Sequence, residues 1–294
     1  MMDLSQSTPW RVGDEWIGRD HTEIMGIVNC TPDSFFDGGK HATMELATEH
    51  AVRLLDEGAL ILDIGGESTR PGSQPVSAEP EISRVIPVIQ NLAALQSQRH
   101  FFLSVDTVKA KVAVEAVRAG AQIVNDVSMG ADPDMAALVA DSSCSLVLNH
   151  TRGKPKVMQL NPFYNDVLTE VGQELRQAAQ HFLDCGVAQE RICLDPGIGF
   201  GKRLKDNYTL IAKADHFHAL GFPLLYGMSR KSYIGNTDGL EKSDRLIPSV
   251  VSATLVAQQG VGVVRVHDVA ATREALIMLG AITGEKNMSQ AKGM

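Results

Sequence analysis

The stretch EIMGIVNCTPDSFFDGGKH (residues 23–41) joins two different kinds of sequence. Its first seven residues are almost continuously apolar, as in a strand that is buried on both faces of a parallel sheet. At Asn29 it changes into a loop with two aspartates, two adjacent phenylalanines and a Gly-Gly pair. A plain connection needs only a few turn residues, and a long loop with such side chains is more often a binding loop. This stretch therefore predicts a core strand that leads into a functional loop.

The same alternation continues along the chain. Further apolar runs occupy residues 59–65, 100–106, 121–127, 144–150, 191–197, 222–229 and 261–268. Amphipathic segments such as 42–58 and 167–186 lie between them and end in Gly, a common C-terminal signal of helices. Eight strands that are each followed by a helix predict an α/β fold, a (β/α)8 TIM barrel, with an open doubly wound sheet as the alternative.

No linker or repeat divides the sequence, so we expect a single barrel domain. We place it at residues 10–282, with flexible termini at 1–9 and 283–294. The active site of such a barrel is expected at the C-terminal ends of the strands.

Composition narrows the classes of function. The chain has 294 residues, a net charge of −8 and no Lys/Arg block, which excludes nucleic acid as an expected partner. No apolar run approaches the roughly 20 residues that span a bilayer, and the N-terminus lacks the pattern of a secretory signal. The four cysteines show no CxxC spacing and are typical of free thiols in a reducing cytoplasm.

Polar residues follow every predicted strand. A single Asp or Asn at such a position is usually a turn residue or a helix N-cap. In a barrel, however, all of these positions meet at the C-terminal face, so the whole set predicts an active site. The residues are Asn29, Asp63, Asp106, Asn125–Asp126, Asn149–His150, Asp195, Ser229–Lys231 and Arg265–His267.

The chemistry of this set favours a flat heterocycle that carries a phosphate group. Asp106, Asn125 and Asp195 offer acceptors and amide groups to ring N–H groups and a ring carbonyl. Lys231 suits a ring carbonyl or nitrogen, and Arg265 can stack its guanidinium on a ring and still reach an anion.

The phosphate would be held by basic side chains and a metal ion. Arg70, Arg265 and His267 are candidates for phosphate oxygens, and Asn29 has the hard oxygen ligand that Mg²⁺ prefers. The run GIGFGK (197–202) lacks both GxGxxG spacing and a GK[ST] ending, because Arg203 follows Lys202. Its glycines therefore predict an ordinary turn.

Taken together, these segments resemble the dihydropteroate synthases of bacterial folate synthesis, over roughly Trp10 to Gly280. The resemblance rests on MGIVNCTPDSFFDGG (25–39), LDIGGESTRPGS (62–73), SVDT (104–107), NDVS (125–128), LDPGIGFGK (194–202), GMSRKSYIG (227–235) and VRVHDV (264–269). It implies a TIM barrel, and a transferase that joins 4-aminobenzoate to 6-hydroxymethyl-7,8-dihydropterin pyrophosphate. The products would be 7,8-dihydropteroate and pyrophosphate, with Mg²⁺ assisting the loss of pyrophosphate.

The resemblance also implies roles for individual residues. The pterin would contact Asp106, Asn125, Asp195, Lys231, Arg265 and Phe200, and Phe200 would also border the aminobenzoate. The aminobenzoate would contact Phe35, Thr69, Pro71 and Ser232. Pyrophosphate would contact Asn29, Arg70, Arg265 and His267, and Mg²⁺ would bind Asn29 and Asp37. Catalysis would depend on Asp106, Lys231, Arg265, His267 and Arg70. From the resemblance we also expect a homodimer and a target of sulfonamides.

Two residues depart from the family pattern beside the pterin pocket. Asn149 and Thr151 replace the methionines usual in the family, which leaves the local packing of the pterin pocket unpredicted.

Two other functions stay open as alternatives. A pterin-binding methyltransferase that serves a corrinoid protein would share the Asp/Asn/Asp pocket. A non-catalytic pterin-binding relative would share it too. The loops TPDSFFDGG (31–39) and STRPGS (68–73) favour the synthase over both.

Overall fold

The computed structural model describes residues 7–31, 40–68, 75–153 and 162–284. Within these ranges the core is an eight-stranded parallel sheet with the order β8-β7-β6-β5-β4-β3-β10-β9. The strands are β3 (Glu23–Asn29), β4 (Ile61–Gly65), β5 (Phe102–Asp106), β6 (Ile123–Asp126), β7 (Ser145–Asn149), β8 (Ile192–Asp195), β9 (Leu225–Gly227) and β10 (Val263–Val266). Each lies inside one of the predicted apolar runs, so all eight strand predictions are confirmed.

The sheet closes into a barrel. The two outermost strands of that order, β8 and β9, meet through a parallel bridge between Leu194 and Leu224. The backbone N–H of Leu194 donates to the carbonyl of Pro223 at 2.9 Å. This closure confirms the TIM barrel and excludes the open doubly wound sheet, which would leave two free edges.

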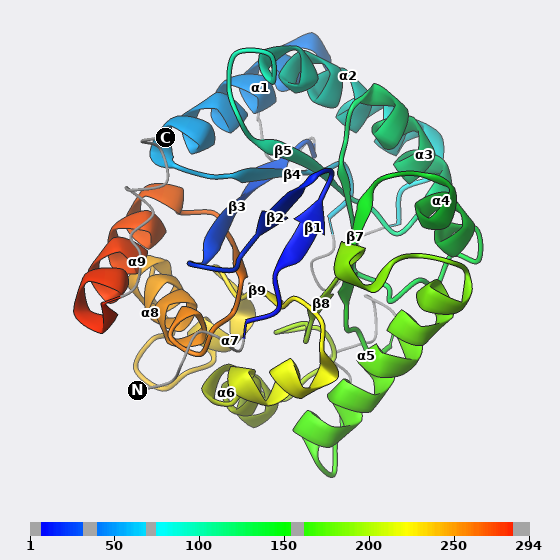
Figure 1. Cartoon of the computed structure of the whole chain (residues 1–294). Helices are drawn as coiled ribbons and strands as arrows, with labels where there is room; N and C mark the ends of the chain where they lie inside the picture. The colour runs from blue at the N-terminus through cyan, green and yellow to red at the C-terminus, as the bar shows by residue number, and fades with distance from the viewer. Residues whose placement is uncertain (1–6, 32–39, 69–74, 154–161, 285–294) are drawn as a thin grey trace.

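Helices surround the strands on the outside of the barrel (Figure 1). They are α1 (Lys40–Glu57), α2 (Ala78–Leu95), α3 (Ala110–Ala119), α4 (Met135–Asp141), α5 (Val167–Asp184), α6 (Leu204–Ala212), α7 (Ser232–Gly235), α8 (Leu246–Ala257) and α9 (Val269–Thr283), with 3-10 helices η3 (Gln189–Arg191) and η4 (Ala214–Leu220). The predicted helices at 42–58 and 167–186 correspond to α1 and α5. Among the described helices, none combines the length and apolar character of a membrane span.

Both faces of each strand are buried, which explains the continuous apolar runs. In β4, Leu62 and Ile64 pack outward in the core shared with the helices. Ile61 belongs to a second, inner core, and Asp63 is fully buried further along the strand. The barrel interior is therefore apolar toward the N-terminal ends of the strands and polar toward their C-terminal ends.

A short antiparallel hairpin, β1 (Trp10–Val12) and β2 (Glu15–Ile17), closes the apolar end of the barrel. Figure 1 shows it lying across the middle of the ring of strands. Trp10 packs into the inner core, and its Nε1 donates to the carbonyl of Arg191 at 3.0 Å. The hairpin was not predicted, because three-residue strands are too short to show a sequence period.

Candidate active site

The register of the sheet brings the predicted strand-end residues to one level. Asn29 pairs with Gly65, Gly65 with Asp106, and Asp106 with Asn125. The C-terminal ends of barrel strands are the face on which enzymes of this fold build their sites. Most of the polar groups there form one set, which we call the barrel-mouth cluster: Asp63, Asp106, Asn125, Asn149, Asp195, Lys231 and Arg265.

Arg265 lies at the centre of one half of this cluster. Its Nε donates to Asp63 Oδ2 and its Nη2 to Asp106 Oδ2, both at 2.6 Å. Asp63 also accepts from Ser104 Oγ at 2.6 Å and from Asn125 Nδ2 at 2.9 Å. Two carboxylates thus fix the plane of the guanidinium, because such N–H donors have a fixed planar geometry.

Asp63 was predicted as a member of the strand-end set, but no role was assigned to it. The sequence places it at a strand end, but the arginine that needs its charge is 202 residues away. Asp106 was predicted, and its environment is unusual. Burial raises the pKa of Asp106 to about 7, against the opposing effect of Arg265. A carboxyl group that changes charge near neutral pH is a common property of functional sites.

Asp195 organises the other half of the cluster. Its Oδ2 accepts from Asn149 Nδ2 at 2.9 Å, and its Oδ1 accepts from the backbone N–H of Gly197 at 2.8 Å. Burial raises the pKa of Asp195. The buried Oδ1 atoms of Asn125 and Asn149 have no hydrogen-bond partner among the described residues. Because a buried acceptor without a partner is costly, these two atoms are natural contacts for a ligand.

Lys231 faces Asp195 from the loop after β9. Its ammonium donates to the carbonyl of Ile198 at 2.6 Å and lies 4.4 Å from the centre of the Phe200 ring. Burial lowers the pKa of Lys231 to about 8, although Asp195 acts to raise it. The structure therefore brings together Lys231, Phe200 and Asp195, three of the residues that the resemblance assigns to the pterin.

Three further predicted residues lie at the same end of the barrel. His267 follows β10, and its Nδ1 lies 3.0 Å from Ser229 Oγ. Asn29 ends β3 and is half-buried. Ser232 begins α7 and is exposed, but this helix has only four residues, too short for a strong helix dipole.

Several predicted residues cannot be placed against this geometry. They lie outside the described ranges and are Phe35, Asp37, Thr69, Arg70 and Pro71. Among the residues that the structure does describe, no three His, Cys, Asp or Glu side chains are placed to hold a metal ion.

The run 197–202 is a glycine turn, as predicted, but its lysine has an unpredicted place. Gly197, Gly199 and Gly201 all have positive φ angles, which favour glycine. Lys202 is buried and its Nζ lies 2.9 Å from His150 Nδ1. No local sequence signal could have found this place, because the partner His150 lies on another loop, 52 residues earlier.

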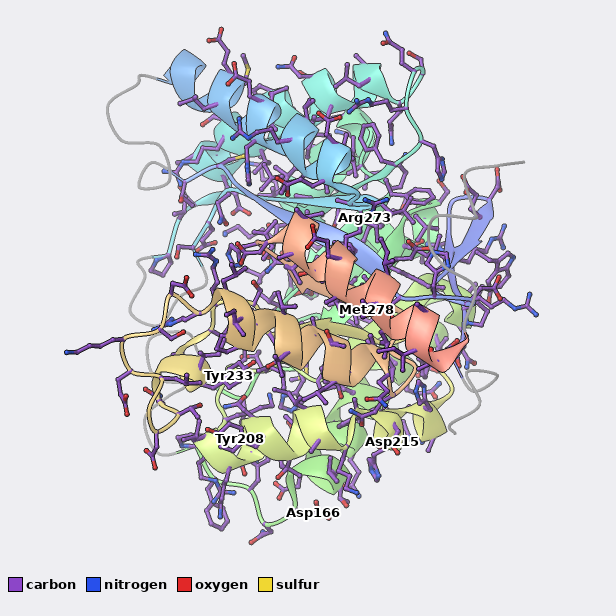
Figure 2. The ribbon with its side chains drawn as sticks, turned by 90° about the vertical axis from the view of Figure 1, so that its left-hand side faces the viewer. Asp166, Tyr208, Asp215, Tyr233, Arg273 and Met278 are labelled. Carbon is purple, nitrogen blue, oxygen red and sulfur yellow. The ribbon has the colours of Figure 1, made fainter. Side chains whose placement is uncertain are left out.

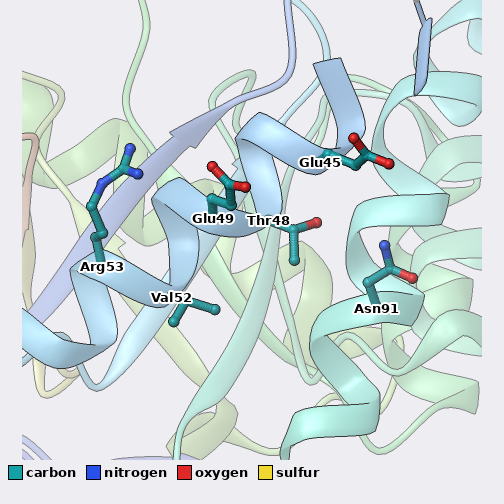
Figure 3. Close-up of a pocket in the computed structure, with 6 residues that line it drawn as sticks. All are labelled: Glu45, Thr48, Glu49, Val52, Arg53 and Asn91. Carbon is teal, nitrogen blue, oxygen red and sulfur yellow. The ribbon is translucent and has the colours of Figure 1, made fainter. Parts of the chain in front are cut away.

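A separate hollow lies between α1 and α2 on the outside of the barrel (Figure 3). Its lining residues are Glu45, Thr48, Glu49, Val52, Arg53 and Asn91. None of them lies at a strand end, and the hollow has no contact with the barrel-mouth cluster. It therefore does not compete with the barrel mouth as the functional site.

Comparison with known proteins agrees with this geometry. The family model described as pterin binding enzyme matches residues 25–267. The dihydropteroate synthase of Escherichia coli K12 is 42% identical over 266 residues, which cover 90% of this chain and 93% of that one.

Two solved structures share the fold along nearly the whole chain. Yersinia pestis dihydropteroate synthase with a sulfonamide drug has a TM-score of 0.87 at 39% identity, covering 94% of this chain and 100% of the other. Xanthomonas albilineans dihydropteroate synthase with 4-aminobenzoic acid has a TM-score of 0.86 at 43% identity, covering 94% and 98%. The chain described here thus belongs to the pterin-binding enzymes and, among them, to the dihydropteroate synthases.

Proposed function

We propose that the barrel-mouth cluster carries out the dihydropteroate synthase reaction in this chain. This transfer reaction of folate biosynthesis joins 4-aminobenzoate to 6-hydroxymethyl-7,8-dihydropterin pyrophosphate and releases 7,8-dihydropteroate and pyrophosphate. One observation supports the proposal most strongly. Asp195 and Asn125 are buried hydrogen-bond acceptors, and the cationic side chains of Lys231 and Arg265 lie in the same cluster. A pterin ring offers N–H groups and a carbonyl that complement such a set.

The pterin edge would bind to the free acceptors of the cluster. Asn125 Oδ1 is buried without a described partner, and Asp195 is held by two N–H donors that leave room for further hydrogen bonds. Ligand N–H groups would satisfy these acceptors, and Lys231 would donate to the ring carbonyl or a ring nitrogen. Phe200 would border the ring, since it already contacts the Lys231 ammonium.

Arg265 is suited to stack on the pterin face. Its Nε and Nη2 are committed to Asp63 and Asp106, so its orientation is set before any ligand binds. The flat face of the guanidinium remains available for stacking. Its remaining N–H groups, with His267 and Arg70, would contact the pyrophosphate.

The reaction would proceed by loss of the leaving group before the new bond forms. The C–O bond between the pterin methylene and pyrophosphate breaks, and pyrophosphate departs with the electron pair. The neutral arylamine nitrogen attacks the resulting cation-like carbon and then loses a proton. Because the nucleophile is neutral, charge stabilisation on the leaving group matters more than a strong base. Asp106 would stabilise the positive pterin through the negative charge of its carboxylate, and it also orients Arg265.

Magnesium fits this site as a partner of the leaving group. Asn29 offers an amide oxygen at the barrel mouth, and Asp37 would add a carboxylate. Mg²⁺ keeps several waters and uses substrate phosphates, so one or two protein oxygens suffice. When bound, the ion would neutralise charge that develops on pyrophosphate.

The aminobenzoate would enter beside the two loops that follow β3 and β4. We assign Phe35, Thr69, Pro71 and Ser232 to this substrate, with Phe200 at the border between the two substrates. The Xanthomonas relative holds 4-aminobenzoic acid and the Yersinia relative a sulfonamide, which supports the same pocket and sulfonamide inhibition here.

We also propose a cytoplasmic homodimer. The four cysteines are free thiols, which suits a reducing compartment. On α8, Ile247, Val251 and Leu255 follow each other at four-residue spacing and are 72%, 51% and 47% exposed. Met278 and Ile282 on α9 are 61% and 76% exposed. Figure 2 shows α8 and α9 side by side, with Met278 on α9.

This apolar surface, the α8–α9 stripe, is a suitable contact for a second copy of the chain. Exposed apolar side chains gathered on neighbouring helices mark interaction surfaces, and most soluble oligomers are symmetric homo-oligomers. The stripe lies on the helix layer, so pairing there would leave the strand ends open to substrates.

Equilibrium binding of dihydropterin pyrophosphate tests the assigned pocket. Asp195→Asn should weaken binding about tenfold or more, because a buried acceptor of ligand N–H groups loses its charge. The matched control is Asp126→Asn at the end of β6, two strands away in the sheet, where the carboxylate accepts hydrogen bonds from Ser128 and Gly130 of its own loop. Equal binding by both variants and the unmodified chain would refute the pocket assignment.

A further inference from the structure

Lys202 is a buried lysine that the reaction above does not use. Only 3% of Lys202 is exposed, and His150 beside it is fully buried. A lysine is almost never buried to this extent unless its N–H groups have partners. The surroundings of its Nζ therefore indicate what it holds in place.

Three hydrogen-bond acceptors surround the Nζ of Lys202, and burial lowers the pKa of this amine well below the usual lysine value. Its Nζ lies 2.9 Å from His150 Nδ1, 3.0 Å from the carbonyl of Phe200 and 3.4 Å from the carbonyl of His150. Two of these acceptors belong to the loop after β7 and one to the loop after β8. Lys202 thus ties the two loops together.

His150 is oriented to accept this hydrogen bond. Its Nε2 lies 2.9 Å from Glu174 Oε2, so the ring N–H is assigned to Nε2 and the Nδ1 lone pair faces Lys202. Burial lowers the pKa of His150 to about 4, which keeps the ring neutral. Glu174 is in turn held by Arg152. The acceptor is therefore fixed by a chain of contacts that reaches α5.

The backbones of the two loops are in direct contact. A Cβ on Gly197 would lie 1.9 Å from the carbonyl oxygen of His150, and a Cβ on Gly201 would lie 2.2 Å from that of Arg152. Both glycines have positive φ angles. No side chain fits between them, so the two loops are packed backbone against backbone.

The same loop forms the cradle of Lys231. The carbonyl of Ile198 accepts from Lys231 Nζ at 2.6 Å, and the Phe200 ring lies 4.4 Å from that atom. A Cβ on Gly199 would already touch the Lys231 side chain at 3.3 Å. A shift of this loop would therefore displace the cation assigned to the pterin.

We propose that Lys202 is a positioning residue for pterin binding, which fixes the loop after β8 on His150 so that Ile198 and Phe200 hold Lys231 in place. The inference rests on the proposed function only for its second half. Its first half, that Lys202 places Lys231 against Phe200, concerns the protein without any ligand. The two halves can therefore be tested separately.

The test compares Lys202→Met with Lys205→Met, an exposed lysine three residues along the chain on α6. In the ligand-free protein, NMR would follow the Lys231 side-chain methylene protons next to the Phe200 ring. We expect ring-current-shifted resonances in the unmodified chain and in Lys205→Met. In Lys202→Met they should move to ordinary lysine positions. A residue that served stability alone would lower the melting temperature and leave these resonances unchanged.

Substrate measurements then test the second half. Lys202→Met should raise the Kd of dihydropterin pyrophosphate about tenfold, the loss expected for one misplaced charged donor. The KM for 4-aminobenzoate at saturating pterin should change less than this Kd, because Phe200 is the one residue assigned to that substrate whose backbone Lys202 is seen to hold. Unchanged resonances and unchanged pterin affinity in the folded variant would overturn the inference.

A second variant covers the case in which Lys202→Met does not fold. Glu174→Gln keeps the buried pair but removes the charge that orients His150, and Glu174 is partly exposed. It should shift the same resonances in the same direction by a smaller amount, and no shift would contradict the proposal. If the unmodified chain itself bound no pterin, the proposed function would fail while the NMR comparison would still decide the role of Lys202.

Discussion

Asn149 donates its side-chain amide to Asp195 between neighbouring strands, with 2.9 Å from Nδ2 to Oδ2. This contact orients Asn149 so that its buried Oδ1 is left without a described partner. The asparagine that departs from the family pattern is therefore an ordered part of the cluster. Its Nδ2 orients Asp195, and its Oδ1 can accept a hydrogen bond from a ligand.

Replacing this asparagine should weaken pterin binding. Asn149→Leu keeps a similar size but removes both the donor to Asp195 and the free acceptor, and we expect about a tenfold rise in the Kd of dihydropterin pyrophosphate by calorimetry. Ser145→Ala is the control on the same strand, since Ser145 Oγ donates to the carbonyl of Arg11 at the other end of the barrel. An unchanged Kd in a folded Asn149→Leu variant would show that Asn149 serves packing alone.

Asp63 should be required for the stability of the barrel as well as for activity. Asp63→Asn removes one of the two charges that hold Arg265, and breaking a buried pair of this kind costs roughly 3–5 kcal/mol. Denaturant unfolding would measure the change. Asp56→Asn is the control, because its pair with Arg99 is exposed and worth about 0–1 kcal/mol. Equal decreases in the free energy of unfolding of the two variants would mean that the buried Asp63–Arg265 pair contributes no more to stability than the exposed pair.

Pterin affinity should fall as the pH rises through about 8. The pKa of Lys231 is lowered to about 8, so the ammonium that donates to the ligand is present below this pH and lost above it. Binding would be measured from about pH 6 to about pH 11, a range that spans both this pKa and the ordinary lysine value.

Lys231→Met separates this effect from titration of the ligand itself. The variant should bind more weakly at low pH and lose the part of the alkaline decline that belongs to the lysine. If the two proteins gave parallel curves, Lys231 would not be the titrating contact.

The α8–α9 stripe should be the contact surface between the two copies of a dimer. Leu255→Glu places a charge in the stripe and should convert a dimer into a monomer in sedimentation or light-scattering measurements, because burying an unpaired charge is costly. Leu46→Glu on α1 is the matched control, since Leu46 is 41% exposed and Leu255 is 47% exposed. A dimer that survives Leu255→Glu would place the contact between copies elsewhere.

The sequence predicted the barrel because each strand is buried on both faces and reads as a continuous apolar run. It also predicted which strand ends meet, since parallel strands of a barrel present their C-terminal ends on one side. The sequence could not predict which side chains of the site form hydrogen bonds and ion pairs with each other. Asp63 and Arg265 are 202 residues apart, and only closure of the barrel determines that they touch.

Lys202 shows a second reason for incomplete prediction. Its neighbours in sequence are turn glycines, whose conformation depends on local geometry and was predicted correctly. Its partner His150 lies 52 residues earlier, on another loop. Burial of a polar side chain depends on such distant contacts, so a local pattern does not reveal it. The hairpin β1–β2 was missed for the opposite reason, as it is too short to carry any pattern.

The most direct test of the account is pyrophosphate release from 6-hydroxymethyl-7,8-dihydropterin pyrophosphate with Mg²⁺, with and without 4-aminobenzoate. We expect pyrophosphate release together with formation of 7,8-dihydropteroate when aminobenzoate is present, and a strong loss of both in Asp195→Asn. Pterin that binds the unmodified chain but never yields pyrophosphate or dihydropteroate would contradict it, and would make the chain a non-catalytic pterin-binding protein.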